Sequence, residues 1–233
     1  GELMPIPDIQ FPEESWVSKA SARWRDVVVP SAWVGQELYT HGELDFDGNP
    51  KLYNAKGRLT LGPQKQQADI ALQVRGTPEL VELQQFDIVQ PKGRLAATGK
   101  VNLKPQLAWV VDAQGKDFDP GAFAVEWPGS LRFQLATQGK MTDQGPDATL
   151  KLSELRGRLR GRQISGDADM TLTAPYLPAG TVALNSGQSS LRVEAAKGEN
   201  INATIAVNVA SLNDWVPDSE GELAANFRVL GKW

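Results

Sequence analysis

Hydrophobic and polar residues alternate with a period of two along most of this chain. Successive side chains of a strand point to opposite faces, so each such segment has one apolar face and one wet face. Turn-forming clusters separate the segments, for example at 47–50, 90–93 and 197–200. The alternating segments lie at 68–74, 95–103, 107–113, 131–135, 168–172, 201–209 and 223–229. The pattern predicts an all-β fold with ten or more antiparallel strands.

Helical periodicity is almost absent. Two short segments, 117–123 and 211–215, are each compatible with a single helical turn, the first with an Asp N-cap and a Pro near the first turn. The even spacing of Trp16, Ala20, Ala22 and Trp24 predicts one more strand near the start of the chain. A Pro-rich lead-in over 1–12 is expected to be a loop or an extended edge.

The chain also repeats itself. Residues 56–59 match 156–159, and 68–72 match 168–172, both at an offset of 100. Further matches keep the same order at slightly smaller offsets, ending with 129–140 and 221–232. We therefore expect residues 1–41 to be the lead-in and N-terminal strand of a preceding repeat, 42–140 a first repeat and 141–233 a second. A period of about 95 residues predicts an elongated array in which each unit contacts its neighbours.

Composition removes several classes of chemistry. The 233 residues include no Cys and one His, and the net charge is −4. Disulfides, thiolate metal sites, Cys nucleophiles and multi-His metal sites are therefore excluded, and a basic footprint for nucleic acid is missing. His41 is expected to be solvated in a turn. We expect no metal, no cofactor, no catalytic residue and no enzymatic activity, because no catalytic motif occurs.

Two charged patterns have alternative interpretations. Asp167 and Asp169 alternate on one strand, which a solvated sheet face explains better than a pair of catalytic carboxylates. A polysaccharide-active β-solenoid enzyme would require such a pair converging in a cleft. Residues 156, 158, 160 and 162 are all Arg. This ladder is expected to lie on an outward strand face beside acidic residues, although it could also touch lipid head groups or phosphates.

The apolar strand faces need a cover, and no helices are predicted to supply one. An antiparallel sheet can bury such a face against a second sheet, by curling on itself, or against an apolar molecule from outside. The first arrangement is a closed sandwich, and the last is an open apolar channel along an extended sheet. No segment is long and apolar enough to be a membrane helix or signal peptide, and we expect the chain to be part of a longer protein.

Three segments carry a resemblance to a known family. Residues 127–139 begin Trp-Pro-Gly-Ser-Leu and continue with strict alternation, and 212–223 show a similar order of Leu, Trp, Pro and Gly-Glu-Leu. Residues 155–167 repeat Leu and Gly at hairpin spacing. These elements resemble the TamB family of the AsmA-like superfamily, over residues 40–233.

The resemblance implies a fold, partners and a location. TamB-like proteins are anchored in the inner membrane of Gram-negative bacteria and span the periplasm. Their repeats form a long, twisted antiparallel β-sheet folded along its length, with an apolar interior. They partner the outer-membrane barrel protein TamA, and they are implicated in phospholipid transport and in the assembly of outer-membrane proteins such as autotransporters.

Two functions follow as hypotheses. In the first, the apolar face is a conduit for phospholipid acyl chains. In the second, a free sheet edge pairs with strands of unfolded outer-membrane protein clients, as a chaperone would. The occupant of the interior, lipid or peptide, distinguishes them. The residues expected to line the conduit are Ile70, Leu72, Val74, Leu95, Val101, Leu103, Trp109, Val111, Leu131, Phe133, Leu135, Met170, Leu172, Ile205, Val207 and Phe227.

Overall fold

A computed structural model describes residues 18–31, 36–49, 51–64, 66–216 and 218–231. Most of them form strands, and the two predicted helical turns are present as 3-10 turns, η1 and η2. Asp119 caps η1 by accepting a hydrogen bond from the Gly121 amide. Trp16 and the lead-in over 1–12 lie outside the described residues. The elements are β1 (Ser18–Val29), β2 (Leu38–Asn49), β3 (Leu52–Gly62), β4 (Ala68–Gly76), β5 (Leu80–Val89), β6 (Arg94–Asn102), β7 (Ala108–Phe118), η1 (Pro120–Ala122), β8 (Gly129–Thr142), β9 (Gly145–Leu159), β10 (Arg162–Thr173), β11 (Leu177–Ser186), β12 (Ser189–Ala195), β13 (Ile201–Val209), η2 (Leu212–Asp214) and β14 (Leu223–Gly231).

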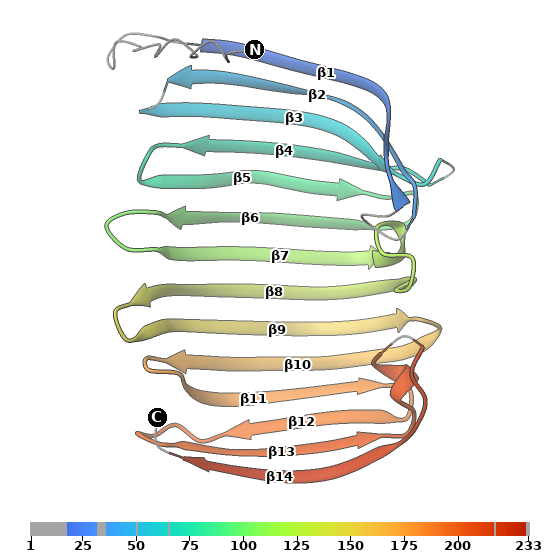
Figure 1. Cartoon of the computed structure of the whole chain (residues 1–233), viewed down its shortest axis with the longest axis vertical. Helices are drawn as coiled ribbons and strands as arrows, with labels where there is room; N and C mark the ends of the chain where they lie inside the picture. The colour runs from blue at the N-terminus through green and yellow to red at the C-terminus, as the bar shows by residue number, and fades with distance from the viewer. Residues whose placement is uncertain (1–17, 32–35, 50, 65, 217, 232–233) are drawn as a thin grey trace, which may run out of the picture.

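All the strands belong to one sheet in which each strand pairs with the next one in the chain (Figure 1). The 14 strands are antiparallel, and the sheet does not close on itself. At roughly 4.8 Å between strands, the sheet is about 60 Å long in the stacking direction. The prediction of an all-β, twisted antiparallel sheet is confirmed, and among the described residues no second sheet covers it.

Strand register gives the sheet one apolar and one polar face. Across β3 to β6, Leu59 pairs with Ile70, Ile70 with Ile88, and Ile88 with Leu95. Paired residues point to the same side, so these four side chains share a face that we call the inner face. The intervening residues, such as Arg58 and Asp69, share the opposite or outer face. The predicted alternation is therefore preserved across the whole sheet.

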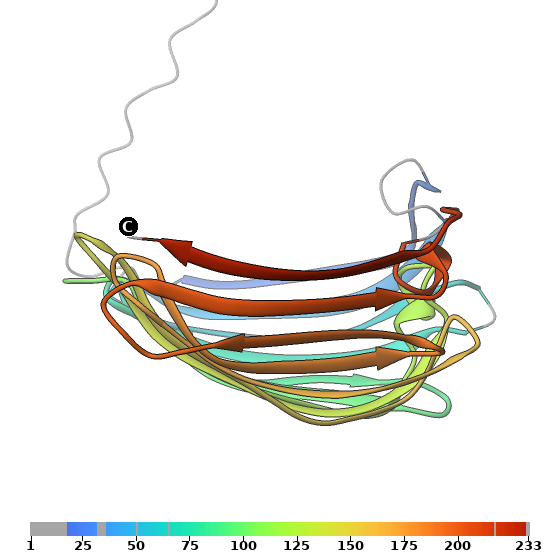
Figure 2. The same cartoon turned by 90° about the horizontal axis from the view of Figure 1, so that it is seen from below.

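The inner face is the concave one. Figure 2, which looks along the stacking direction, shows the strands bent into a trough with η1 above its concave side. Phe123, which follows η1, packs with Phe118 against the inner-face residues Ala68, Ile70 and Ile88. Because η1 returns over the side where these residues point, that side is the concave one. The apolar stripe thus becomes the floor of an open trough.

Glycines make this curvature possible. Side chains crowd on the concave side of a bent sheet, so small residues are favoured there. A Cβ placed on Gly115 would lie 2.4 Å from the ring of Phe133, and one on Gly139 would lie 2.5 Å from the indole of Trp109. Both glycines therefore leave space for an aromatic ring on the next strand. The rings lie across the sheet rather than standing up from it.

The repeated sequence segments occupy strands that are six places apart. Residues 56–59 lie in β3 and 156–159 in β9, while 129–140 lie in β8 and 223–231 in β14. The turns η1 and η2 occur at the same place in this order, just before β8 and β14. The expected repeat boundaries, 41/42 and 140/141, fall inside β2 and β8. The two predicted repeats are thus parts of one continuous sheet rather than separate globular units.

Candidate functional site

The trough floor is almost free of charge. Outside the bulges, the inner-face positions of the described strands carry one charged side chain, Arg162, which begins β10 at the margin of the sheet. The outer face by contrast carries most of the Lys, Arg, Asp and Glu residues of the strands. This nearly uncharged surface is continuous over about 60 Å, and no second layer packs on it among the residues that the structure describes.

Polar atoms within the floor are paired locally. The Trp24 indole N–H donates to the Thr40 hydroxyl over 3.1 Å, and the Trp109 indole N–H donates to the Thr137 hydroxyl over 3.2 Å. Thr137 in turn donates to the backbone carbonyl of Thr149 over 2.9 Å. Both Trp–Thr pairs join neighbouring strands on the inner face. The two indoles therefore add apolar surface to the trough without leaving a free donor there.

The trough has a sealed part and an open part. In the sealed part, Ala68 is 0% exposed and Ile70 and Ile88 are each 9% exposed, beneath Phe118 and Phe123. Elsewhere, large inner-face residues meet solvent, and Phe227 on β14 is 53% exposed. The open part contains partly exposed aliphatic side chains on many consecutive strands. Only this part can take an apolar ligand without displacing a protein side chain.

The structure places 15 of the 16 predicted lining residues on the inner face. Ile70 and Leu95 belong to the sealed part, since Ile70 is buried there and Leu95 packs against it. Leu103 lies beyond the end of β6, in the connection to β7, and is 46% exposed. The remaining lining residues, including Val111, Leu135, Met170 and Val207, are half-buried along the open part, and Phe227 is exposed there.

One long margin of the trough is reinforced by contacts between distant segments. Gln36, just before β2, lies 3.4 and 3.3 Å from the carbonyls of Gly121 and Ala122 in η1. Arg160, in the turn from β9 to β10, donates to the backbone and side-chain oxygens of Asn213 in η2, each over 2.6 Å. Its guanidinium also lies 5.5 Å from the ring centre of Trp127. Sequence patterns gave no sign of these contacts.

The Arg160 contacts correct the interpretation of the arginine ladder. Arg156 and Arg158 lie on the outer face, Arg160 is in a turn with a φ of 53°, and Arg162 is on the inner face. The expectation of one outward ladder is therefore wrong, because the turn at 160–161 reverses the chain. The predicted acidic pairing is also wrong for Arg156, whose register partners are Arg132 and Ser165.

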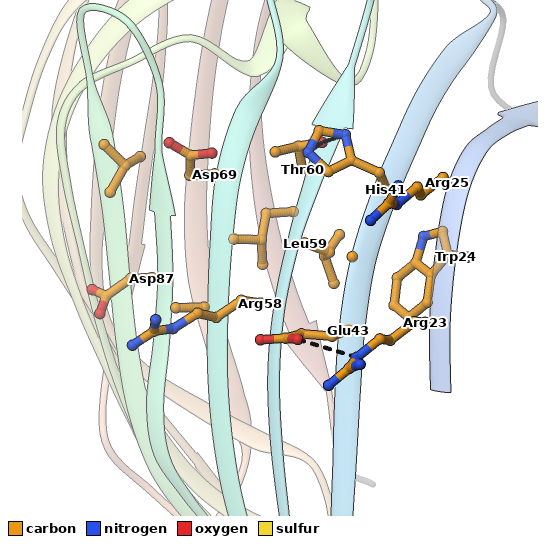
Figure 3. A pocket seen from close by; sticks show the side chains of 14 residues that line it. Arg23, Trp24, Arg25, His41, Glu43, Arg58, Leu59, Thr60, Asp69 and Asp87 are labelled. Carbon is orange, nitrogen blue, oxygen red and sulfur yellow. Dashed lines mark hydrogen bonds and ion pairs between the residues drawn. The ribbon is translucent and has the colours of Figure 1, made fainter. Parts of the chain in front are cut away.

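The outer face has a depression of about 520 Å³ over β1 to β5 (Figure 3). There Glu43 lies between Arg23 and Arg58, which are its register partners, and its carboxylate is 3.6 Å from Arg23 Nε. Asp69 and Asp87 line the same depression. Opposite charges in neighbouring strands stabilise a solvated sheet face. This mixed-charge surface is thus accounted for by strand pairing.

His41 lies in this depression. It is in the middle of β2 rather than in a turn, so the turn prediction is wrong. Its side chain is exposed, as expected, and its Nδ1 atom lies 2.8 Å from the Thr60 hydroxyl. The prediction interpreted the neighbouring Gly42 as a turn residue. In the structure this glycine instead allows β2 to pack closely against Leu59 on β3.

Within the described ranges, no group of three or more His, Cys, Asp or Glu side chains is arranged to hold a metal ion. Within the same ranges, no helix has the length and apolar character needed to cross a membrane.

A comparison with protein families gave one match to the whole described sheet. The family model for the TamB N-terminal domain matches residues 8–233. The chain belongs to the TamB family. The match reaches further toward the N-terminus than the resemblance in the sequence motifs, which began near residue 40. Searches of curated proteins and of solved structures gave no match.

Proposed function

We propose that the concave face of this TamB-family chain binds phospholipid acyl chains and guides them along the sheet. The observation that carries the proposal is that, outside the bulges, the inner-face positions of the described strands carry no charged side chain other than Arg162. An acyl chain that replaces water against such a wall gains about 0.8 kcal/mol per buried CH₂ group. Since the open part of the wall is apolar on consecutive strands, movement along that part changes the binding energy little. No covalent step and no cofactor are required.

Family membership supports a setting for this activity. A TamB-family protein functions in outer-membrane biogenesis, and we propose that this chain is a periplasmic portion of such a protein, anchored in the inner membrane. In that setting the trough would form part of a path for phospholipid between the membranes. The outer-membrane barrel protein TamA is the proposed partner. Binding of unfolded outer-membrane protein strands by β-pairing remains the alternative use of the same sheet.

Native mass spectrometry of the purified chain tests the proposal. We expect adducts with the masses of phospholipids. These adducts are expected to be lost in Phe133→Arg and in Val207→Asp, which place a charge on the open floor. Asn208→Asp is the matched control, because Asn208 is next to Val207 but faces outward. Bound peptide without lipid would favour the chaperone alternative, and equal lipid binding by all variants would refute the trough as the binding site.

A further inference from the structure

One row of residues on the outer face breaks the charge pattern of the rest of that face. Elsewhere on the outer face, charged residues pair across strands with opposite charges or with neutral residues. Arg75 pairs with Glu82, and Glu82 pairs with Lys100, with 2.8 Å between the Glu82 carboxylate and the Lys100 ammonium. The series from Arg23 through Glu43 to Arg58 alternates in the same way. Alternation is the arrangement that stabilises a solvated sheet.

The exceptional row crosses β6 to β9. Arg94 pairs with Lys116, and Arg132 pairs with Arg156. A bulge interrupts the register between β7 and β8, and it places Lys116 and Asp117 together across from Arg132. Four cations thus follow one another on four consecutive strands. We call them the basic row, and all four are exposed.

The basic row is not neutralised by the protein. Asp117 and Glu154 lie at bulges beside it, but neither forms an ion pair with it among the residues that the structure describes. Like charges directly opposite in a sheet are destabilising, and the chain as a whole is acidic, with a net charge of −4. A feature that opposes sheet stability in an acidic protein indicates a role in contacting an anionic partner.

We propose that the basic row docks the outer face on the phosphate groups of an anionic phospholipid bilayer. Three of the four side chains are Arg, whose guanidinium group pairs with phosphate through two parallel hydrogen bonds. Most outer-face neighbours of the row are small or polar, including Ala96, Gln114, Ser130 and Ser165, whereas Val89, the register partner of Arg94, is an exposed apolar residue. A single exposed valine is not an apolar pocket of the kind that anchors a protein partner. A charged surface without such anchors fits a partner recognised by charge alone.

The position of the row gives the docking a direction. The four residues lie near the same end of their strands, which is the end where β7 leads into η1, at the right of Figure 1. They therefore border one long margin of the trough. A bilayer held against the row would lie beside that margin. The proposal concerns the outer face and does not depend on what the concave face holds.

Vesicle co-sedimentation of the whole chain tests the docking. Phosphatidylcholine vesicles containing phosphatidylglycerol are expected to bind the chain, and binding is expected to weaken with added salt. The variant with Arg94, Lys116, Arg132 and Arg156 all changed to Gln is expected to bind at least tenfold more weakly. A variant with Arg58, Arg75, Lys151 and Arg228 changed to Gln removes the same charge from elsewhere on the outer face. Its binding is expected to stay within about threefold of the unmodified chain.

Two further measurements test whether the row variant is still folded and whether the partner is a bilayer or an acidic protein segment. All four substitutions are at exposed positions, so the far-ultraviolet spectrum of the row variant is expected to match that of the unmodified chain. Equal binding of pure phosphatidylcholine vesicles, no binding of anionic vesicles, or equal losses in the two variants would each overturn the proposal. Binding of polyglutamate in place of anionic vesicles would also overturn it, because the partner would then be an acidic protein segment.

Discussion

Charges placed at two depths of the concave face are expected to have very different effects on stability. Val207 on β13 is half-buried in the open part of the trough, whereas Ile70 is 9% exposed beneath Phe118 and Phe123. Complete burial of a valine side chain contributes about 1.5–3 kcal/mol, so a half-buried valine contributes about half of that. An Asp at position 207 keeps contact with water and avoids most of the penalty for a buried charge. We expect Val207→Asp to lower the free energy of unfolding by about 1–2 kcal/mol.

An Asp at position 70 has no such access to water. Ile70→Asp loses nearly all of the isoleucine's burial and adds the cost of an unpaired charge, which together reach several kcal/mol. That is a large part of the roughly 5–15 kcal/mol that stabilises a typical domain. We therefore expect the β3 to β6 region to lose its structure in this variant.

Thermal unfolding followed by circular dichroism distinguishes the two cases. Val207→Asp is expected to lower Tm by about 2–8 °C, and Ile70→Asp by far more. Asn208→Asp, on the outer face of the same strand, is expected to change the free energy of unfolding by less than about 0.5 kcal/mol. If Val207→Asp unfolds the chain as completely as Ile70→Asp does, the floor near β13 is a closed core. If it leaves both stability and lipid binding unchanged, that floor does not carry lipid.

Three other changes test separate parts of the structure. Arg160→Ala removes two hydrogen bonds to Asn213 and is expected to lower the free energy of unfolding by about 1–3 kcal/mol. Amide hydrogen exchange over 211–216 is expected to become faster, and unchanged exchange would contradict a stabilising role for these contacts at the margin. Phe123→Ala uncovers the sealed part of the trough and is expected to lower the free energy of unfolding by about 2–4 kcal/mol. Native mass spectrometry is expected to show more bound lipid, and a loss of stability without added lipid would show that this part only supports the fold. The hydrogen bond and charge of Lys100 lower the pKa of the Glu82 carboxyl. An NMR titration of Lys100→Gln is therefore expected to show that pKa raised toward its ordinary value, and no change would mean that the ion pair does not persist in solution.

Local pattern was sufficient for the strands and for their two faces. Side chains alternate across a strand whatever the rest of the chain does, so Leu135, Met170 and Val207 could be assigned to a common apolar face from the order of residues alone. The short turns η1 and η2 were also predictable, because an N-cap or a nearby Pro acts within a few residues. Leu103 was placed in a strand because alternation does not show where pairing stops. His41 was predicted to lie in a turn because glycine is a common turn residue. The sequence alone does not show that Gly42 instead packs against a neighbouring strand.

Tertiary structure decided which parts of the apolar face stay open and how the sheet is bent. Ile70 and Phe227 have the same alternating pattern, yet Ile70 is 9% exposed and Phe227 is 53% exposed. The difference arises because Phe123 returns over Ile70 on β4 and Ile88 on β5, which lie 53 and 35 residues before it in the chain. The basic row likewise depends on strand register and on a bulge, which set which residues of four different strands stand side by side. Alternation specifies the face of a residue within its own strand, but its neighbours and its cover are specified by pairing over long distances in the chain.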